Sequence, residues 1–320
     1  MKKKIYFLAP KNKWGTYFYY KEISEYLIRN NSDIYDIKFC NTFIDYIKLH
    51  FIKSDIIFSI IPFLFKPLFT KRFIFNLHWN YKIERKNKWL WVKLLYFTEV
   101  NFWFSDKIIL TSYYLADKLN FREKYNKKIK ILPNFIDNKN FDFWDKEYDE
   151  LRYKILTITN FTFLNKWKWI LNLWNVISKL WKNTNKKIIW TIIWNDDSIN
   201  FLKIKKEFDK IIFWKNIKVI WKWWCKKDEI KWELKNNDYF LYWTFFDNFP
   251  WVILEAIASK MKVLVNNFES FKYFLDKEII CRNEDEMLKK ILSNSISINT
   301  VEEFWLERII KDIINIINKW

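Results

Sequence analysis

The sequence contains one glycine in 320 residues, Gly15, alongside 21 tryptophans. An average chain of this length carries about 22 glycines, at about 7% usage. The glycine and tryptophan counts together therefore equal the count expected for glycine alone. Glycine reaches positive φ without strain and lets the backbone approach a ligand closely. Taken literally, the shortage excludes glycine from nearly every turn of the chain.

Several tryptophans stand next to expected strands, at positions that we interpret as turns. These are Trp14 before Gly15, Trp190 and Trp194 on either side of T-I-I, and Trp221, Trp223 and Trp224 after I-K-V-I. A bulky residue is strained at positive φ, so our hypothesis is that most of these codons are read as glycine, as in lineages that reassign the UGA stop codon. The alternative is a genuinely tryptophan-rich protein. Because of this ambiguity, the aromatic content of 22% does not indicate a platform for stacking nucleic-acid bases.

Cysteine is also scarce, and the three that are present follow no pattern: Cys40, Cys225 and Cys281. No C-x-x-C pair and no histidine at ligand spacing accompanies them, which argues against a disulfide framework and a zinc site. A reducing cytosol fits this composition. The apolar start of the chain is interrupted at Pro10 and Lys11, too early for a signal peptide. No stretch reaches about 18 uninterrupted apolar residues, so a membrane-spanning helix is not expected.

Acidic residues are too few to balance the basic ones: 56 Lys and Arg face 37 Asp and Glu, which gives a formal charge of +19. Such a balance is typical of proteins that bind nucleic acid, an anionic membrane surface or an acidic substrate. No RNA-recognition, KH or helix-turn-helix pattern is present, so we expect no nucleic-acid partner. The alternative to a membrane role is a Lys, Ile, Asn and Phe-rich composition that only reflects an AT-rich genome.

Short apolar runs alternate with helical patterns, which is typical of strands linked by crossover helices in a parallel sheet. In the first half we predict strands at 4–8, 34–39, 55–60, 72–78 and 107–111, and helices at 17–29, 88–105 and 113–119. The segment 129–137, I-K-I-L-P-N-F-I-D, closes this half. A polar stretch up to Tyr153 is the expected linker.

The second half repeats the rhythm, with predicted strands at 153–159, 187–194, 216–220, 238–242 and 262–266, and helices at 170–180, 199–213 and after Pro250. We therefore predict an α/β protein with two Rossmann-like domains, at residues 1–145 and 150–300. A last helix within 301–320 is expected to pack back on the first domain. Ligands of such sheets bind beyond the carboxyl ends of the strands, here in a cleft between the domains.

Two carboxylates eight positions apart mark the segment D-N-F-P-W-V-I-L-E-A-I-A, residues 247–258. Pro250 suits the first turn of a helix, which puts Asp247 in the loop before that helix and Glu255 on it. The N–H groups of the first turn, from Trp251 to Ile253, are suited to bind a diphosphate. Such a segment can hold ribose hydroxyls, sugar hydroxyls and phosphate together. From spacing alone, a capping acid followed by a surface Glu is an equal alternative.

This segment resembles the donor-binding signature of glycosyltransferase family 4 and its relatives, in which an acid, seven residues and a Glu precede an apolar helix. Asp247 stands in place of the usual first Glu, and Trp251 occupies a position that is often glycine. Three further segments resemble the family in the expected order: I-L-P-N-F-I-D, N-K-W-K-W-I, and N-N-D-Y-F-L-Y-W-T-F-F-D. The resemblance implies the GT-B fold, with two facing Rossmann-like domains.

The resemblance also implies roles for residues of the second domain. Glu255 is expected to bind the ribose hydroxyls, and Asp247 is expected to bind the donor sugar. The backbone amides of Val252 and Ile253 are expected to bind the phosphates. The donor site is completed by Phe249, Pro250 and Trp251. Lys168 or Lys166 is expected to neutralise the departing diphosphate, which is the main electrostatic work of sugar transfer. The family usually adds an Arg a few residues earlier, where Asn160 stands here, so both lysines are expected to share the task.

In the first domain, Trp14 and Gly15 resemble the glycine loop by which the family approaches the diphosphate. His78 ends the strand at 72–78, where the family often has a His near the reacting sugar. It is a candidate to orient a hydroxyl or a developing charge, and a structural role is the alternative. Asp196 and Asp197 follow a strand, and we interpret them as a solvated turn rather than a metal site.

These features predict a glycosyltransferase that uses a nucleotide-diphosphate sugar, with His78, Lys168 and Asp247 as catalytic residues. The resemblance further implies retention of anomeric configuration and no metal or cofactor. We expect a glycan or lipid-linked acceptor, in the synthesis of a cell-surface polysaccharide or glycolipid. A cytoplasmic location is expected, with peripheral attachment to the inner face of the membrane. The alternatives are an epimerase or phosphorylase of the same fold and, from another class, a basic nucleic-acid-binding protein.

Overall fold

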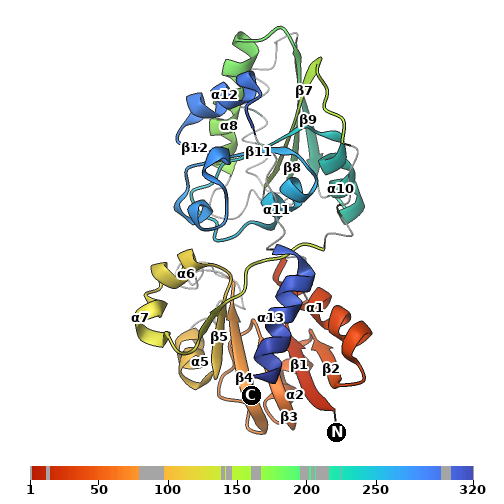
Figure 1. The fold of residues 1–320 in the computed structure, drawn as a ribbon, viewed down its shortest axis with the longest axis vertical. Helices are drawn as coiled ribbons and strands as arrows, with labels where there is room; N and C mark the ends of the chain where they lie inside the picture. Colours follow the sequence, from red (N-terminus) through yellow and green to blue (C-terminus); the bar gives the residue numbers. More distant parts are fainter. Residues whose placement is uncertain are drawn as a thin grey trace. The chain divides into compact units, whose positions relative to one another are not determined.

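The structure is a computed structural model that describes residues 2–11, 15–78, 97–137, 141, 146–159, 167–194, 202, 206, 216–223, 225–296 and 304–319. The chain folds into two compact units (Figure 1). The first unit consists of residues 1–135 together with 304–320, and the second of residues 136–303. Each unit is built around its own parallel sheet of six strands.

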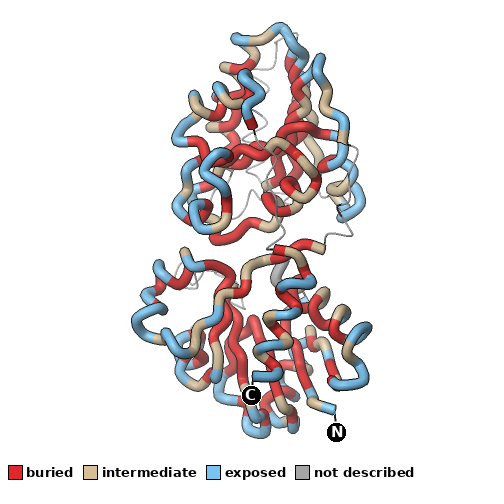
Figure 2. Tube along the Cα trace, viewed as in Figure 1, coloured by how far each residue is buried: buried red, intermediate tan, exposed pale blue. Residues whose placement is uncertain are grey.

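The sheet of the first unit has the strand order β2-β1-β3-β4-β5-β6. Its strands are β1 (Lys3–Leu8), β2 (Tyr35–Cys40), β3 (Ser54–Ser59), β4 (Thr70–Leu77), β5 (Lys107–Leu110) and β6 (Ile129–Ile131). All neighbouring strands pair in parallel. Their apolar residues are buried in unbroken runs, as in 73–75 of β4, which is typical of a parallel sheet covered on both faces (Figure 2).

The helices described between or after these strands are α1 (Gly15–Asn31), α2 (Phe43–Leu49), α5 (Thr98–Phe104), α6 (Tyr113–Lys118) and α7 (Phe121–Tyr125). Side chains fix the start of two of them. Thr42 and Asp45 form a capping box at α2, and the Ser112 hydroxyl accepts the Leu115 N–H at α6. The predicted helix at 113–119 is therefore confirmed over 113–118, and α7 after it was not predicted.

The last helix, α13 (Leu306–Asn318), packs on the first unit. Its apolar stripe is buried, and Ile309, Ile313 and Ile317 are almost fully enclosed. Polar contacts tie it to both edge strands of the sheet: the Tyr35 hydroxyl donates to Asn318 Oδ1 at 2.9 Å, and Lys130 forms an ion pair with Asp312 at 3.1 Å. The last helix of the chain thus completes the N-terminal unit.

The sheet of the second unit has the strand order β12-β11-β10-β7-β8-β9. Its strands are β7 (Arg152–Thr159), β8 (Lys187–Trp194), β9 (Ile217–Trp223), β10 (Tyr239–Tyr242), β11 (Lys262–Asn266) and β12 (Ile280–Cys281). Its helices are α8 (Trp167–Lys182), α10 (Lys227–Asn236), α11 (Trp251–Ala258) and α12 (Glu284–Ser293), with 3-10 turns η4 (Glu269–Tyr273) and η5 (Lys277–Ile279). The predicted class, α/β with two Rossmann-like parallel sheets, is confirmed.

The stretch interpreted as a linker is tied to the second unit before β7 begins. Lys146 donates to the carbonyl of Leu234 at 2.8 Å and to that of Ser259 at 3.3 Å. Burial lowers the pKa of Lys146 to about 8, against the smaller opposing effect of Asp238. The polar stretch before β7 is therefore held against the second unit by hydrogen bonds.

Two other predicted regions are regular only in part or lie beyond the described residues. In the segment 129–137, the strand ends at Ile131, and Pro133 just after it offers no N–H to continue a ladder. The predicted helices at 88–105 and 199–213 lie largely outside the described residues. Of the first, residues 98–104 form α5.

Four of the tryptophans that we interpreted as turn residues lie in strands instead, two of them in the predicted strand at 187–194, which is confirmed. Trp190 and Trp194 belong to β8, and Trp221 and Trp223 belong to β9. The indole of Trp190 is fully buried, and its Nε1 donates to Thr157 Oγ1 at 3.0 Å. A parallel sheet covered on both faces accepts such bulk, so the turn interpretation of these four positions was wrong. Trp14 and Trp224 lie outside the described residues.

Positive φ is taken up by other residue types among the described residues, namely Asn120, Lys260 and Asn294. Lys260 follows α11 with φ of 59°, a position at which glycine is favoured. The Met261 N–H donates to the Ala256 carbonyl at 3.1 Å across this residue, which closes the helix end. The chain therefore ends α11, the helix of the predicted donor segment, without glycine.

Candidate functional site

The topology of the second sheet brings two of the predicted segments to one edge. The chain runs from β7 outward through β8 to β9, and then returns to β10 on the other side of β7. β7 and β10 are parallel neighbours, with Ile155 opposite Tyr239 and Leu156 opposite Phe240. Their carboxyl ends therefore meet at the same edge, at a topological switch point, which is where open α/β sheets bind ligands. N-K-W-K-W-I follows β7, and D-N-F-P follows β10.

A direct contact links the start of α8 to the loop after β10. The rings of Trp169 and Phe245 lie edge to face, with centroids 6.1 Å apart. Trp169 is the third residue of α8 and is buried, so it fixes the first turn of that helix beside the loop. The backbone of Lys168 belongs to this turn, whereas its side chain and all of Lys166 lie outside the described residues. Asn160 lies outside them as well.

The loop after β10 is held in shape by Asn266, the last residue of β11. Its amide donates to the Thr244 carbonyl and accepts the Thr244 N–H, each at 2.8 Å. The Thr244 hydroxyl in turn accepts the Phe246 N–H at 3.1 Å. Both Asn266 and Thr244 are buried. Hydrogen bonds in a buried setting are costly to break, so the loop reaches Asp247 in a fixed conformation.

Asp247 is half-buried and oriented by two hydroxyls. The Tyr242 hydroxyl donates to Asp247 Oδ2 at 2.6 Å, and the Ser270 hydroxyl donates to the Asp247 carbonyl at 2.6 Å. Burial, and after it the negative charge of Asp247, raises the pKa of Tyr242 well above its usual range. Tyr242 therefore remains a hydrogen-bond donor to the carboxylate. No local sequence pattern indicates either partner, and Ser270 lies 23 positions away.

The helix start that follows is uncapped by any side chain. Pro250 is its N-cap, and the ring of Phe249 stacks on Phe274 with centroids 4.0 Å apart. The Ile253 N–H donates to the Pro250 carbonyl at 3.3 Å, so one of the two amides predicted for phosphate already has an acceptor. The first turn of a helix leaves N–H groups without intrahelical partners, and Val252 is in this turn.

Glu255 lies one turn into α11, on the half-buried side of the helix. Its neighbours Leu254 and Ala256 are fully buried, as is Ile253. α11 therefore faces the core with its apolar residues, and the carboxylate is on the remaining side with Trp251 and Val252, which are also half-buried. The structure thus places the predicted donor residues of this segment on one loop and one helix.

His78, in the first unit, follows β4 at the carboxyl edge of its sheet. Its ring lies edge to face on Tyr19 of α1, with centroids 4.7 Å apart, and its side chain is within hydrogen-bonding reach of Asn134. The Nε2 atom is fully enclosed although the residue as a whole is half-buried. Burial lowers the pKa of His78 to about 3, against the smaller opposing effect of Asn134. His78 is therefore neutral at physiological pH.

Gly15, another candidate of the first unit, lies at the switch point of the first sheet. This point is between β1 and β3, because the chain goes from β1 to β2 on one side and then to β3 on the other. Gly15 opens α1 just after β1, and Trp14 lies outside the described residues. Asn134 comes from the segment I-L-P-N-F-I-D, so this segment reaches the same edge as His78. No spacing in the sequence indicates that these two residues meet.

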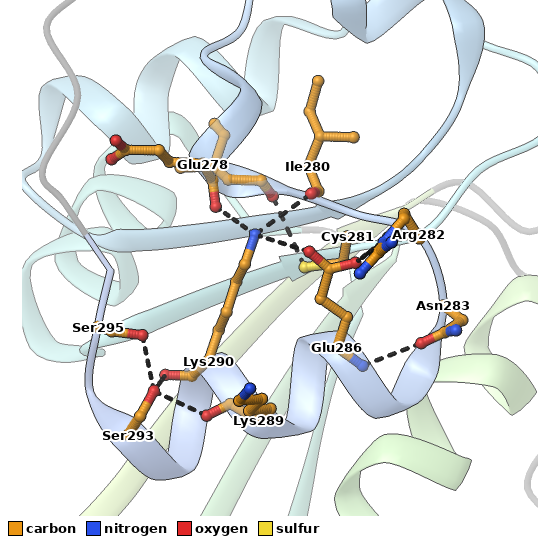
Figure 3. A network of polar contacts seen from close by, with 11 residues as sticks. Glu278, Ile280, Cys281, Arg282, Asn283, Glu286, Lys289, Lys290, Ser293 and Ser295 are labelled. Carbon is orange, nitrogen blue, oxygen red and sulfur yellow. Dashed lines mark hydrogen bonds and ion pairs between the residues drawn. The ribbon is translucent and has the colours of Figure 1, made fainter.

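A polar hollow on the second unit lies elsewhere, around β12 and α12 (Figure 3). Lys290 donates to the carbonyls of Glu278 and Ile280 and pairs with Glu286 at 3.4 Å. The Arg282 guanidinium lowers the pKa of Glu286 to about 2. These charges satisfy one another and join η5, β12 and α12, so the hollow has a structural role.

Within the described ranges, no group of three or more His, Cys, Asp or Glu side chains is placed to hold a metal ion. Asp196 and Asp197, interpreted as a solvated turn, lie outside those ranges. Among the helices that the structure describes, none is both long and apolar enough to span a bilayer.

Comparison with solved structures finds the same fold at low sequence identity. The lipopolysaccharide outer core galactosyltransferase WaaB, in its apo form, matches with a TM-score of 0.70 and 14% identity over 99% of this chain and 100% of that chain. Anabaena Alr3699/HepE in complex with UDP and glucose matches with a TM-score of 0.68 and 10% identity, over 99% of this chain and 100% of that chain. The UDP-GlcNAc 2-epimerase from Methanocaldococcus jannaschii matches with 0.60 and 14%, over 100% of both chains.

No protein-family model and no curated protein sequence matches the chain. At identities this low, the structural matches show the fold alone. That fold is the GT-B type, with two Rossmann-like domains, as the sequence predicted. Membership of glycosyltransferase family 4 stays a prediction.

Proposed function

We propose that the chain is a glycosyltransferase that takes a sugar from a nucleotide-diphosphate donor and transfers it to an acceptor hydroxyl, with retention of anomeric configuration. The observation that carries the proposal is the position of segment 247–258. An oriented carboxylate and an uncapped helix start follow β10 at the switch point of the second sheet. HepE supports the proposal, because that protein has the same fold and its structure contains UDP and glucose.

In the proposed donor site, each group of the donor has a matching partner. Glu255 accepts hydrogen bonds from the ribose hydroxyls, and Asp247 accepts them from the sugar. The N–H groups at the start of α11 bind the diphosphate, with Val252 as the principal donor because the Ile253 N–H already has an acceptor. Phe249, Pro250 and Trp251 form the surrounding surface.

The chemistry of transfer requires positive charge beside the leaving group. The bond from the anomeric carbon to the diphosphate oxygen breaks, and its electron pair stays on the diphosphate. The oxygen of the acceptor hydroxyl bonds to the same carbon, and the proton of that hydroxyl passes to an oxygen of the departing diphosphate. Lys168 and Lys166 supply the charge that stabilises the diphosphate as it leaves. The first turn of α8 is beside the loop that carries Asp247, which supports this role. No metal ion, cofactor or protein nucleophile takes part in the proposed reaction.

The acceptor is assigned to the first unit. His78 is neutral there, so its proposed role is a hydrogen bond between its uncharged ring and a hydroxyl of the acceptor substrate or of the donor sugar. It does not act as a cation. We also propose Trp14 and Gly15 as donor-binding residues, as the resemblance to the family's glycine loop implies. We propose a glycan or lipid-linked acceptor of cell-surface polysaccharide or glycolipid synthesis, handled at the inner face of the cytoplasmic membrane. The charge of +19 supports the membrane location.

A sugar-nucleotide epimerase is the second candidate, because the epimerase from M. jannaschii shares the fold. A panel of UDP and GDP sugars separates the two functions. Transfer predicts release of the nucleoside diphosphate from one donor, at a rate that increases when a membrane extract supplies acceptor. Conversion of the donor into its epimer with the nucleotide still attached would instead establish the epimerase, and release that depends on inorganic phosphate would indicate a phosphorylase.

A further inference from the structure

Eight large apolar side chains lie exposed on the first unit, in two segments close to each other. They are Phe43, Ile44, Ile47, Phe51, Leu64, Phe65, Leu68 and Phe69, with exposed fractions between 42% and 63%. We call this set the apolar face. A soluble protein rarely exposes so many large apolar side chains together unless they serve an interaction.

Contacts through His50 join the two segments into one surface. The His50 ring lies 4.5 Å from that of Phe65, centroid to centroid, and its carbonyl accepts the Leu68 N–H at 2.9 Å. Phe51 lies 6.2 Å from Phe65 by the same measure. Residues 43–51 and 64–69 are therefore side by side, although the whole of β3 separates them in sequence.

The fold does not need these side chains for its core. α2 already turns Tyr46 and Leu49 inward, and both are buried. Ile44, Ile47 and Phe51 follow helical spacing on the opposite side, where a helix of a soluble protein normally presents polar residues. Phe43 and Phe65 contact the buried rings of Tyr46 and His50, but a large part of each side chain of the apolar face stays exposed beyond what this packing uses.

Lysines surround the apolar face. Lys48, Lys53, Lys66 and Lys71 lie within or next to the two segments, and all four are exposed. The two aspartates in the same stretch already have partners: Asp45 caps α2 with Thr42, and Asp55 pairs with Lys71 at 2.6 Å. The pKa of each aspartate is lowered by hydrogen bonds from these partners. Lys71 is thus paired with Asp55, and Lys66 lies 4.0 Å from Asp106, so the basic character of the surface rests mainly on Lys48 and Lys53.

We propose that the apolar face docks on an anionic lipid bilayer, with its large side chains in the acyl and headgroup boundary and its lysines on the phosphates. This combination of apolar and basic groups is what an interfacial membrane contact requires. A second copy of the chain fits less well, because it would bring the same lysines face to face between two molecules of charge +19.

The contact leaves the predicted acceptor site open. Residues 51–53 and 64–69 directly precede β3 and β4, so much of the apolar face is at the amino edge of the first sheet. His78 and Gly15 follow strands, at the opposite, carboxyl edge. The inference rests on the membrane location in the proposed function and not on direct contact between the acceptor site and the bilayer, because that site is at the other edge of the sheet. Lipid binding itself is measured with no donor or acceptor present.

The test is sedimentation of the full chain with vesicles of phosphatidylcholine alone or of equal parts phosphatidylcholine and phosphatidylglycerol. The chain is expected to bind only the anionic vesicles, less tightly as salt increases. Ile44→Ser/Ile47→Ser/Phe65→Ser is expected to reduce binding at least about tenfold. Lys48→Glu/Lys53→Glu is expected to reduce it about fivefold for each lysine removed. The matched control is Leu151→Ser/Leu202→Ser, which removes two side chains that are 81% and 59% exposed outside the apolar face, and it is expected to bind as the wild type does.

Three results would overturn the inference: no binding to anionic vesicles at low salt, equal loss of binding in the control variant, or a dimer in light scattering that the triple serine variant dissociates. Thermal melting separates a loss of binding from a loss of folding, because exposed side chains are expected to leave the melting temperature unchanged. Donor turnover is measured separately, so failure of the proposed transfer and failure of lipid docking remain distinguishable.

Discussion

The tryptophan residues raise a question of chemical identity that a mass measurement decides. The hypothesis of reassigned UGA codons predicts that the native protein carries glycine at most of the 21 tryptophan positions, and so is far lighter than the written sequence. Peptide mass spectrometry of protein from its native cells checks positions 190, 194 and 221 directly. Intact tryptophan at these three positions would contradict the hypothesis.

The structure weakens one argument for that hypothesis and leaves the count unexplained. Trp190 fits within β8 and donates a hydrogen bond to Thr157, so no turn at that position requires glycine. Among the described residues, no tryptophan has positive φ. What remains is the shortage of glycine itself, including at Lys260, where a lysine ends α11 with φ of 59°.

The burial of His78 makes the stability of the fold depend on pH in the acid range. An unfolded histidine has a pKa of about 6.5, whereas burial lowers the pKa of folded His78 to about 3. Between these values the unfolded chain binds a proton that the folded chain does not, so the free energy of unfolding decreases as pH falls through this window. Above the unfolded pKa the group has no effect.

His78→Gln is therefore expected to make the fold less sensitive to acid. Its slope of unfolding free energy against pH, measured by urea titration between about pH 6.5 and about pH 3, should be smaller by up to about 1.4 kcal/mol per pH unit. Burial also lowers the pKa of His50, which is still present in the variant. Part of the pH dependence of the unfolding free energy is therefore expected to remain. Parallel slopes for wild type and variant would show that His78 is solvated in the folded protein.

At the scale of elements, the hydrogen bond from Tyr242 to Asp247 connects a buried strand to the proposed donor site. Tyr242→Phe removes a bond to a charged group, which is typically a loss of about 1.5 to 3 kcal/mol. We expect the KM for the donor to increase about tenfold, because Asp247 loses its fixed orientation, with a smaller effect on kcat.

Tyr239→Phe is the matched control for that variant. Tyr239 lies three residues earlier on β10, and its hydroxyl bonds Asn294 at 3.1 Å, away from Asp247. Donor kinetics of the two variants are compared with their melting temperatures. Equal changes in KM for both would mean that the hydroxyl of Tyr242 acts only through the stability of the strand.

Sequence patterns predicted the elements of the site better than their connections. Apolar runs located β7 and β10, and Pro250 located the start of α11, because these signals are local. The contacts that shape the loop join residues far apart in sequence: Asn266 to Thr244, and Ser270 to Asp247. Such pairs depend on how β11 and η4 fold back on β10, which no local pattern records.

At the scale of the whole molecule, the composition indicated a basic protein, but not where on the molecule a basic surface lies. The charge of +19 is spread over the chain, and only the structure shows lysines around exposed apolar side chains on the first unit. The last helix is a similar case. The apolar spacing of α13 indicates a face to bury, but no local pattern shows how that face meets the first unit.

The most direct test of the proposed function is donor binding by Glu255→Ala, measured by isothermal titration calorimetry with the nucleotide sugar selected from the donor panel. Glu278→Ala is the control, since it removes an exposed glutamate from the same unit. The proposed function predicts at least about tenfold weaker donor binding for Glu255→Ala, because lost hydrogen bonds to a carboxylate cost about 1.5 to 3 kcal/mol, and wild-type binding for the control. Wild-type donor affinity and turnover in Glu255→Ala would contradict it.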